Sequence, residues 1–212
     1  ANNVGNIAIG SGSLNATGTN AHTGTIAIGQ DALTALTSGL RTTAIGYQAG
    51  LTATTIDYTT IVGYQAGLKL LDSTHNTLVG YTAGYSLGSD QADNNTFMGT
   101  SAGANGDYTT TNNNTANNNV GIGKSSMGGS QGSGSSYNFT GTNNVAVGVD
   151  SLKVITTGVD NTALGKSAMS AMIAGAYNIA IGSNALADYK GDDSNNAGSK
   201  NIAIGVSAME AF

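Results

Sequence analysis

The chain contains no cysteine, no proline and no tryptophan among its 212 residues. The absence of cysteine excludes disulfide bonds, thiolate metal sites and a cysteine nucleophile, and it leaves the redox compartment undefined. Charged residues make up only 9% of the chain, whereas glycine contributes 32 residues, about twice its share in an ordinary protein. This composition is unlike that of an average enzyme.

Basic clusters and long apolar runs are missing as well. The net charge is −5 and no group of lysines or arginines stands together, so nucleic acid is not expected as a partner. The most apolar stretch, residues 167–182, is rich in small residues and is interrupted by Asn178. A bilayer-spanning helix needs about 20 predominantly apolar residues, so no membrane span is expected.

One short pattern recurs eleven times: a β-branched residue, a residue that is not polar, an aliphatic residue or methionine, and then glycine. The shortest spacing between successive glycines is 17 residues, and every longer spacing, up to 25, is an insertion into this unit. We therefore interpret residues 1–212 as a single repeat domain. The repeat glycines are Gly10, Gly29, Gly46, Gly63, Gly80, Gly99, Gly123, Gly148, Gly165, Gly182 and Gly205.

The residues before each glycine predict a short β-strand. The residue three positions before it is always β-branched, and the residue directly before it is always aliphatic or methionine. These two positions lie on the same face of a strand, and the residue between them, such as Leu78 or Phe97, is never polar. A strand that is apolar on both faces needs a cover on both faces. We expect one face inside the coil and the middle residues, including Leu78 and Phe97, against a second chain.

Asparagine occupies the position four residues before the glycine in eight repeats, and threonine occupies it in the other three. Equivalent residues of stacked coils lie about 4.8 Å apart, so their amides can hydrogen-bond from coil to coil. We expect a structural ladder that fixes the register of the coils. Its members are Asn6, Asn76, Asn95, Asn119, Asn144, Asn161, Asn178 and Asn201.

These patterns predict an all-β fold, a β-solenoid or parallel β-roll of eleven coils with a 17-residue basic repeat. A disordered chain would not keep aliphatic residues at fixed positions in eleven copies, and a helical repeat would show a period of about 3.6 residues. Ten intervals of about 4.8 Å give a rod on the order of 48 Å long.

The repeated phrases resemble two related groups of fibrous proteins. "NIAIGSNAL" (178–186) and "NTALGKSAM" (161–169) resemble the head repeats of trimeric autotransporter adhesins of the YadA type, and "TAIGYQAG" (43–50) is similar to repeats of bacteriophage tail fibres. The resemblance implies a left-handed roll, three chains side by side, and an extracellular rod on a virion or bacterial cell surface that attaches to a host. We therefore expect a segment of a longer fibre. The 17-residue period is longer than the repeat typical of the adhesin heads.

Recognition of a cell-surface glycan or protein receptor is expected in the long insertions, residues 104–118, 128–143 and 187–200. They combine aromatic residues with asparagine, serine, threonine and glycine, a mixture suited to stacking on sugar rings and hydrogen-bonding their edges. The candidate ligand-binding residues there are Tyr108, Tyr137, Phe139 and Tyr189. Tolerated surface insertions with no ligand are the alternative.

Three further candidates, Tyr47, Tyr64 and Tyr81, directly follow the glycine in three consecutive repeats and must stack in a solenoid. They indicate either a structural stack at a corner or chain interface, or an aromatic platform for a glycan. Other functions stay open: a spacer filament without a ligand, an ice-binding solenoid, and a glycan-cleaving tailspike. No catalytic residues, metal site or cofactor are predicted, and His22 and His75 are expected in solvated loops.

Overall fold

The computed structural model describes residues 4–16, 22–88, 92–104, 114–129, 139–189 and 198–210. In these residues the protein is all β and contains no helix. Eleven three-residue strands form one parallel sheet in chain order, one strand for each repeat of the predicted β-solenoid. They are β1 (Ile7–Ile9), β3 (Ile26–Ile28), β5 (Thr43–Ile45), β6 (Thr60–Val62), β7 (Thr77–Val79), β8 (Thr96–Met98), β9 (Val120–Ile122), β10 (Val145–Val147), β11 (Thr162–Leu164), β12 (Ile179–Ile181) and β13 (Ile202–Ile204).

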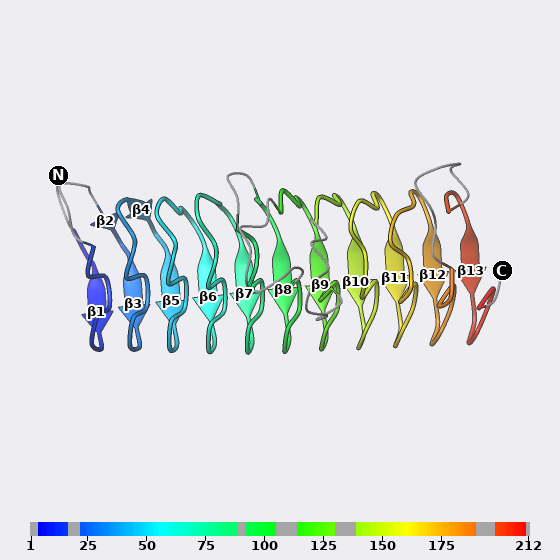
Figure 1. Cartoon of the computed structure of the whole chain (residues 1–212), viewed down its shortest axis with the longest axis horizontal. Helices are drawn as coiled ribbons and strands as arrows, with labels where there is room; N and C mark the ends of the chain where they lie inside the picture. Colours follow the sequence, from blue (N-terminus) through cyan, green and yellow to red (C-terminus); the bar gives the residue numbers. More distant parts are fainter. Residues whose placement is uncertain are drawn as a thin grey trace, which may run out of the picture.

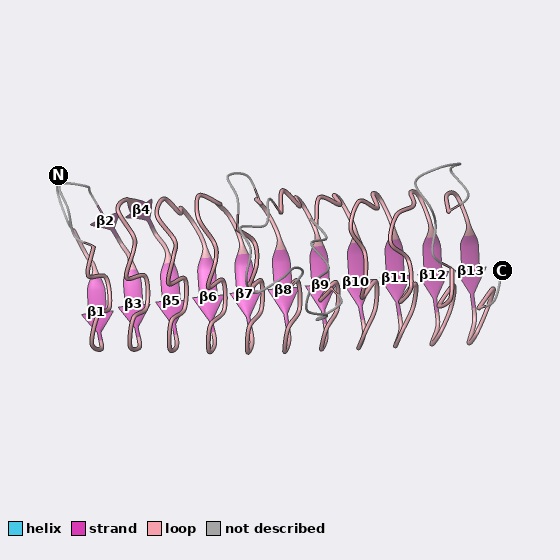
Figure 2. Cartoon of the chain, in the orientation of Figure 1, coloured by secondary structure: helices cyan, strands magenta, loops and turns pink. Residues whose placement is uncertain are grey.

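The sheet runs along the whole molecule, with its strands side by side and pointing in one direction (Figures 1 and 2). Every strand pairs with its neighbours in the same register, so that Ile61 of β6 lies between Ala44 of β5 and Leu78 of β7. The register is kept across the long spacings too, because Phe97 pairs with Gly121, 24 residues later. An insertion therefore lengthens the connection between two strands and leaves their alignment unchanged.

The other sides of the coil are turns joined from coil to coil by backbone hydrogen bonds, for example from Gly50 N to Ala66 O at 3.0 Å. A second, two-stranded parallel sheet joins β2 (His22–Thr23) to β4 (Gly39–Leu40). Across the described ranges, no helix is present that is long and apolar enough to cross a membrane.

From β3 to β13, the middle residue of each strand of the long sheet is buried inside the coil of its own chain, contrary to the prediction that it faces a second chain. Leu78 and Phe97 are both fully buried within this single chain, among the side chains of neighbouring turns. The flanking residues point outward instead: Ile45 and Ile122 on β5 and β9 each keep 38% of their surface exposed. The prediction was wrong because both faces are apolar, and the period of two residues does not tell which is inside.

In most coils one large side chain fills the core, and it comes either from the middle of the strand or from the turn that follows it. Where the middle residue is alanine, the residue six positions later is usually a buried leucine or methionine, as in Ala27 and Leu33. Where the middle residue is large, that later residue is glycine. A Cβ on Gly84 would lie 2.6 Å from Cδ2 of Leu78, so only glycine leaves room for the leucine. The large middle residues and their glycines are Ile61 and Gly67, Leu78 and Gly84, and Phe97 and Gly103.

The repeat glycines stand where two coils approach each other most closely. Gly80 has a φ of 139°, and a Cβ on it would lie 2.5 Å from the carbonyl oxygen of Gly99 in the next coil. Both the positive φ and the short approach demand glycine, as the sequence predicts.

The asparagines form a buried column along the rod. The amide of Asn161 donates to Oδ1 of Asn144 at 3.0 Å and to the carbonyl of Gly175 at 2.9 Å. Its own Oδ1 accepts both the backbone N–H and the amide of Asn178. The same amide contacts join consecutive members from Asn76 to Asn201. The coils from Asn76 to Asn178 are thereby bonded to one another by buried amides, and part-buried Asn201 continues the column into the next coil.

Candidate functional site: the outward face of the sheet

The outward face of the parallel sheet is lined along its length by aliphatic residues, methionine and threonine. Its central stripe, defined as the first and third residues of the eleven strands, holds β-branched residues in the first place and aliphatic residues or methionine in the third. In the coils between the two ends of the rod, these side chains are half-buried or exposed, and Met98 keeps 40% of its surface in solvent. A continuous apolar surface of this kind marks an interaction site more often than a surface left in water.

Two columns of exposed residues border the central stripe. The start column lies two positions before each strand and the end column two positions after it, and their residues are exposed apart from half-buried Ser183. The backbone turns at both columns, since Arg41 has a φ of 53° and Gly46, just before Tyr47, has a φ of 137°. The start column is Gly5, Gly24, Arg41, Tyr58, His75, Asn94, Asn118, Asn143, Asp160, Tyr177 and Lys200. The end column is Ser11, Gln30, Tyr47, Tyr64, Tyr81, Thr100, Lys124, Val149, Lys166, Ser183 and Val206.

Tyr47, Tyr64 and Tyr81 form the stack that their spacing predicts. The ring centroids lie 5.2 Å and 5.3 Å apart, and the planes are within 16° of parallel. Tyr64 is covered on both ring faces by its neighbours, so the stack presents ring edges and hydroxyls outward. A sugar that stacks on an aromatic residue needs an open ring face. The geometry therefore fits a structural stack or a chain interface better than a glycan platform.

A second stack stands in the start column over the same three coils. The guanidinium of Arg41 donates to the hydroxyl of Tyr58 at 2.8 Å and lies 5.4 Å from the centre of its ring. The ring of His75 stacks on the other side of Tyr58, with centroids 5.0 Å apart. The cation and the two rings hold one another in fixed positions. The sequence analysis did not identify this stack, although the 17-residue spacing of Arg41, Tyr58 and His75 could have revealed it.

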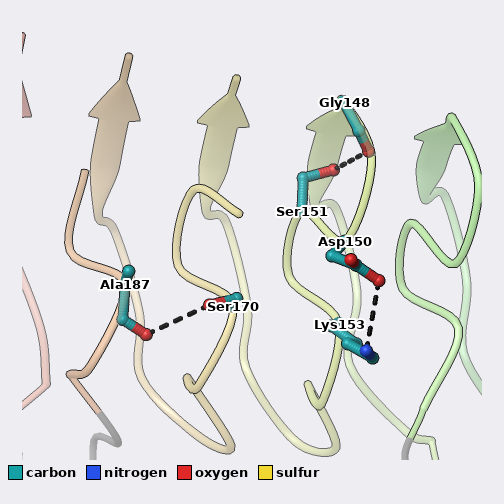
Figure 3. A network of polar contacts seen from close by, with 6 residues as sticks. All are labelled: Gly148, Asp150, Ser151, Lys153, Ser170 and Ala187. Atoms are coloured by element: carbon teal, nitrogen blue, oxygen red, sulfur yellow. Dashed lines mark hydrogen bonds and ion pairs between the residues drawn. The ribbon is translucent and has the colours of Figure 1, made fainter. Parts of the chain in front are cut away.

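The turn that follows the end column is polar and held by local contacts. Figure 3 shows two of these contacts within one coil. Ser151 Oγ donates to the carbonyl of Gly148 at 2.9 Å, and Lys153 Nζ lies 3.2 Å from Oδ1 of Asp150. In the aromatic coils, Gln65 donates to Gln48 Oε1 at 2.8 Å. These contacts stabilise the coil and leave the outward sheet face to other partners.

Two of the four candidate ligand-binding residues of the insertions lie among the described residues, and both of them pack against the core. Phe139 was expected to bind a ligand, but it is fully buried and its ring lies 6.4 Å from that of Phe97 in the core. Its ring is therefore not available to a ligand. Tyr189 is partly buried and packs against the core. Tyr108 and Tyr137 lie outside the described residues.

The ends of the insertions are anchored by contacts that the sequence analysis missed. Buried Asn114 donates its amide to the carbonyl of Ser86 and accepts from the backbone N–H of Phe139 at 2.7 Å. It thus joins three successive turns of the chain. Asp57 and Asp93 act similarly elsewhere, since each accepts a backbone N–H of the preceding coil, from Leu40 and Thr74 respectively.

Neither histidine behaves as a free loop residue. His22, expected in a solvated loop, is fully buried in β2, and this burial lowers the pKa of its imidazole. His75 is exposed but belongs to the stack on Tyr58. Among the described side chains, no group of three or more histidines and carboxylates is placed to hold a metal ion.

The fold defines the chain as a β-solenoid repeat protein with one unpartnered apolar sheet face. Comparison with known proteins adds no relative to this description: no family model, no curated protein and no solved structure matches the chain.

Proposed function

We propose that the chain is a segment of an adhesive fibre, in which the solenoid is a stiff scaffold and the inserted loops carry recognition of a cell-surface glycan or protein. In this proposal several copies of the chain, three by resemblance to the adhesin heads, associate through the outward sheet face. The fibre stands on a virion or a bacterial cell surface, outside the cell.

The observation that supports this role best is the continuity of the ladder through the insertions. Asn119 bonds to Asn95 over 24 residues and Asn144 bonds to Asn119 over 25, with the same amide contacts that join Asn161 to Asn144 over 17. The scaffold therefore tolerates loops of different length without a change of register. Loops on a rigid scaffold can vary in sequence at little cost in stability, which suits recognition.

The loops can be tested by trimming each connection to the 17-residue spacing. Deletion of residues 105–111 removes Tyr108 and keeps Asn114, and deletion of 130–137 removes Tyr137 and keeps Phe139. Deletion of 190–195 shortens the third connection and keeps Tyr189. Each deletion leaves in place the residues that anchor the loop ends, so circular dichroism and the melting temperature should stay close to those of the parent.

Attachment to a panel of bacterial cells, animal cells and immobilised glycans is then measured for the parent and the three trimmed rods. We expect at least one deletion to abolish attachment of a rod that is otherwise intact. If all three trimmed rods attach as well as the parent, the insertions do not carry recognition. If the parent attaches to nothing, the segment is a spacer filament, the alternative that the geometry also allows.

A further inference from the structure

The start and end columns share the position of their aromatic stacks along the rod. Both aromatic stacks occupy the coils of β5, β6 and β7, and they begin and end in the same rows, from Arg41 and Tyr47 to His75 and Tyr81. The two columns of one chain lie beyond opposite ends of the three-residue strands, six residues apart in the sequence. Among the described residues no hydrogen bond, ion pair or ring contact joins them, so the shared position of their stacks points to a contact between molecules.

We propose that copies of this chain associate side by side and in register, with the start column of one copy against the end column of the next. We call this contact between the two columns the seam. It rests on the self-association in the proposed function and says which residues make the contact. A rotation axis parallel to the rod keeps every coil at its own height and brings the start of one strand to the end of its neighbour's strand. Such a contact is heterologous, and it repeats around the axis until the ring of copies closes.

The chemistry of the rows supports this register. Arg41 and His75 would each meet a tyrosine, Tyr47 and Tyr81, whose outward hydroxyl can accept a hydrogen bond from a guanidinium or an imidazole N–H. In the coil of β11, Asp160 would meet Lys166, and both side chains are exposed. Asp160 is the single acidic residue in either column, and the in-register seam places a lysine opposite it. No row brings together two like charges.

The side chains of the seam are already held in place within a single chain, as a contact surface for a second copy would require. Arg41, Tyr58 and His75 already hold one another, as do Tyr47, Tyr64 and Tyr81. Side chains that are already held in place lose less conformational entropy on binding, and tyrosine and arginine are enriched where interfaces are strongest. The central stripe, between the two columns, would form the dry middle of the same interface.

Cysteine crosslinking tests the seam directly because the chain has no cysteine of its own. In the variant with Asp160→Cys and Lys166→Cys, the two cysteines stand two residues beyond either end of β11, which alone spans about 6.6 Å. A disulfide within one chain is therefore not expected, since bridged Cα atoms lie about 4.4–6.8 Å apart. Mild oxidation should therefore join neighbouring copies into closed covalent rings, seen as one discrete band without reductant. The matched control combines Asp160→Cys with Lys124→Cys, two coils away and about 10 Å higher, and should not crosslink.

A charge exchange tests the same row without new cysteines. Lys166→Glu should weaken association by roughly two- to fivefold per seam, and adding Asp160→Lys should restore it. Light scattering of the parent separates the two levels of the proposal. A monomeric parent overturns self-association altogether. An oligomeric parent overturns the seam alone if the matched pair stays uncrosslinked, if the control pair crosslinks as well, or if the charge exchange fails to restore association.

Discussion

The side-chain amide of Asn178 donates to Oδ1 of Asn161 at 2.9 Å, and the backbone N–H of Asn178 donates to the same oxygen at 3.1 Å. One buried oxygen thus satisfies two donors of the next coil, while the amide of Asn161 satisfies the carbonyl of Gly175. Leucine in place of Asn161 would leave several buried groups without hydrogen-bond partners. The ladder is therefore both a source of stability and the device that sets the register of the coils.

We predict that Asn161→Leu lowers the melting temperature strongly, because each buried polar group left without a partner costs about 1–3 kcal/mol. For a chain of this size, 1 kcal/mol corresponds to about 2–4 °C. Thermal unfolding followed by circular dichroism measures the effect. Asn15→Leu is the control, since Asn15 is exposed and outside the ladder. Equal melting of the two variants would contradict a stabilising ladder.

The large core side chain of one coil, Leu78 in the strand, should be replaceable by a leucine in the turn at Gly84. Gly84→Leu alone should destabilise the rod, because its Cβ would lie 2.6 Å from Leu78 Cδ2. Leu78→Ala alone should cost about 2–5 kcal/mol by leaving a cavity. The double variant recreates the arrangement of Ala27 and Leu33, so we expect it to be more stable than either single variant. Chemical denaturation of all four proteins gives the coupling energy, and additive effects would contradict the exchange.

Much of the fold was predictable because the repeat displays it eleven times. The strands, the glycine corner and the asparagine column each follow from one residue type at one fixed position. The exchange between Leu78 and Gly84 is also visible in the sequence, but only when two positions are compared across repeats. The burial of Phe139 was not predictable, since its neighbours in the sequence are polar and its ring packs near Phe97 of another coil. The missing side chain of Gly141 also leaves it room, because a Cβ there would lie 3.2 Å from Cε2 of Phe139.

Stability should depend on pH through His22. Burial lowers the pKa of this imidazole in the folded protein, whereas the unfolded chain titrates near the ordinary value of 6.5. The unfolded state therefore binds more protons below that pH, and the free energy of unfolding should decrease as the pH falls from about 7 to 5. His22→Gln should reduce this slope, and the control His75→Gln should retain it. Chemical denaturation at several pH values measures the slopes, and an unchanged slope in His22→Gln would show that other groups cause it.

The two faces of the strands should respond in opposite ways to a charge. Leu78→Asp places a carboxylate in the core, where an unpaired charge is very costly, so the chain should fail to fold. Ile122→Asp and Ile181→Asp place the carboxylate on the central stripe, where 38% of each isoleucine is exposed. A chain with these two substitutions should fold, and should associate more weakly by roughly 1 kcal/mol or more for each isoleucine that a partner would bury.

Sedimentation velocity measures association in this comparison, and circular dichroism measures the fold. Thr55→Asp is the control for added charge, because Thr55 is exposed and lies outside the sheet and its bordering columns. It should leave both readouts unchanged. If the doubly substituted rod sediments as the parent does, the central stripe is not the surface through which copies meet. If it unfolds, the stripe supports the coil itself, and the outward face contributes to stability without needing a partner.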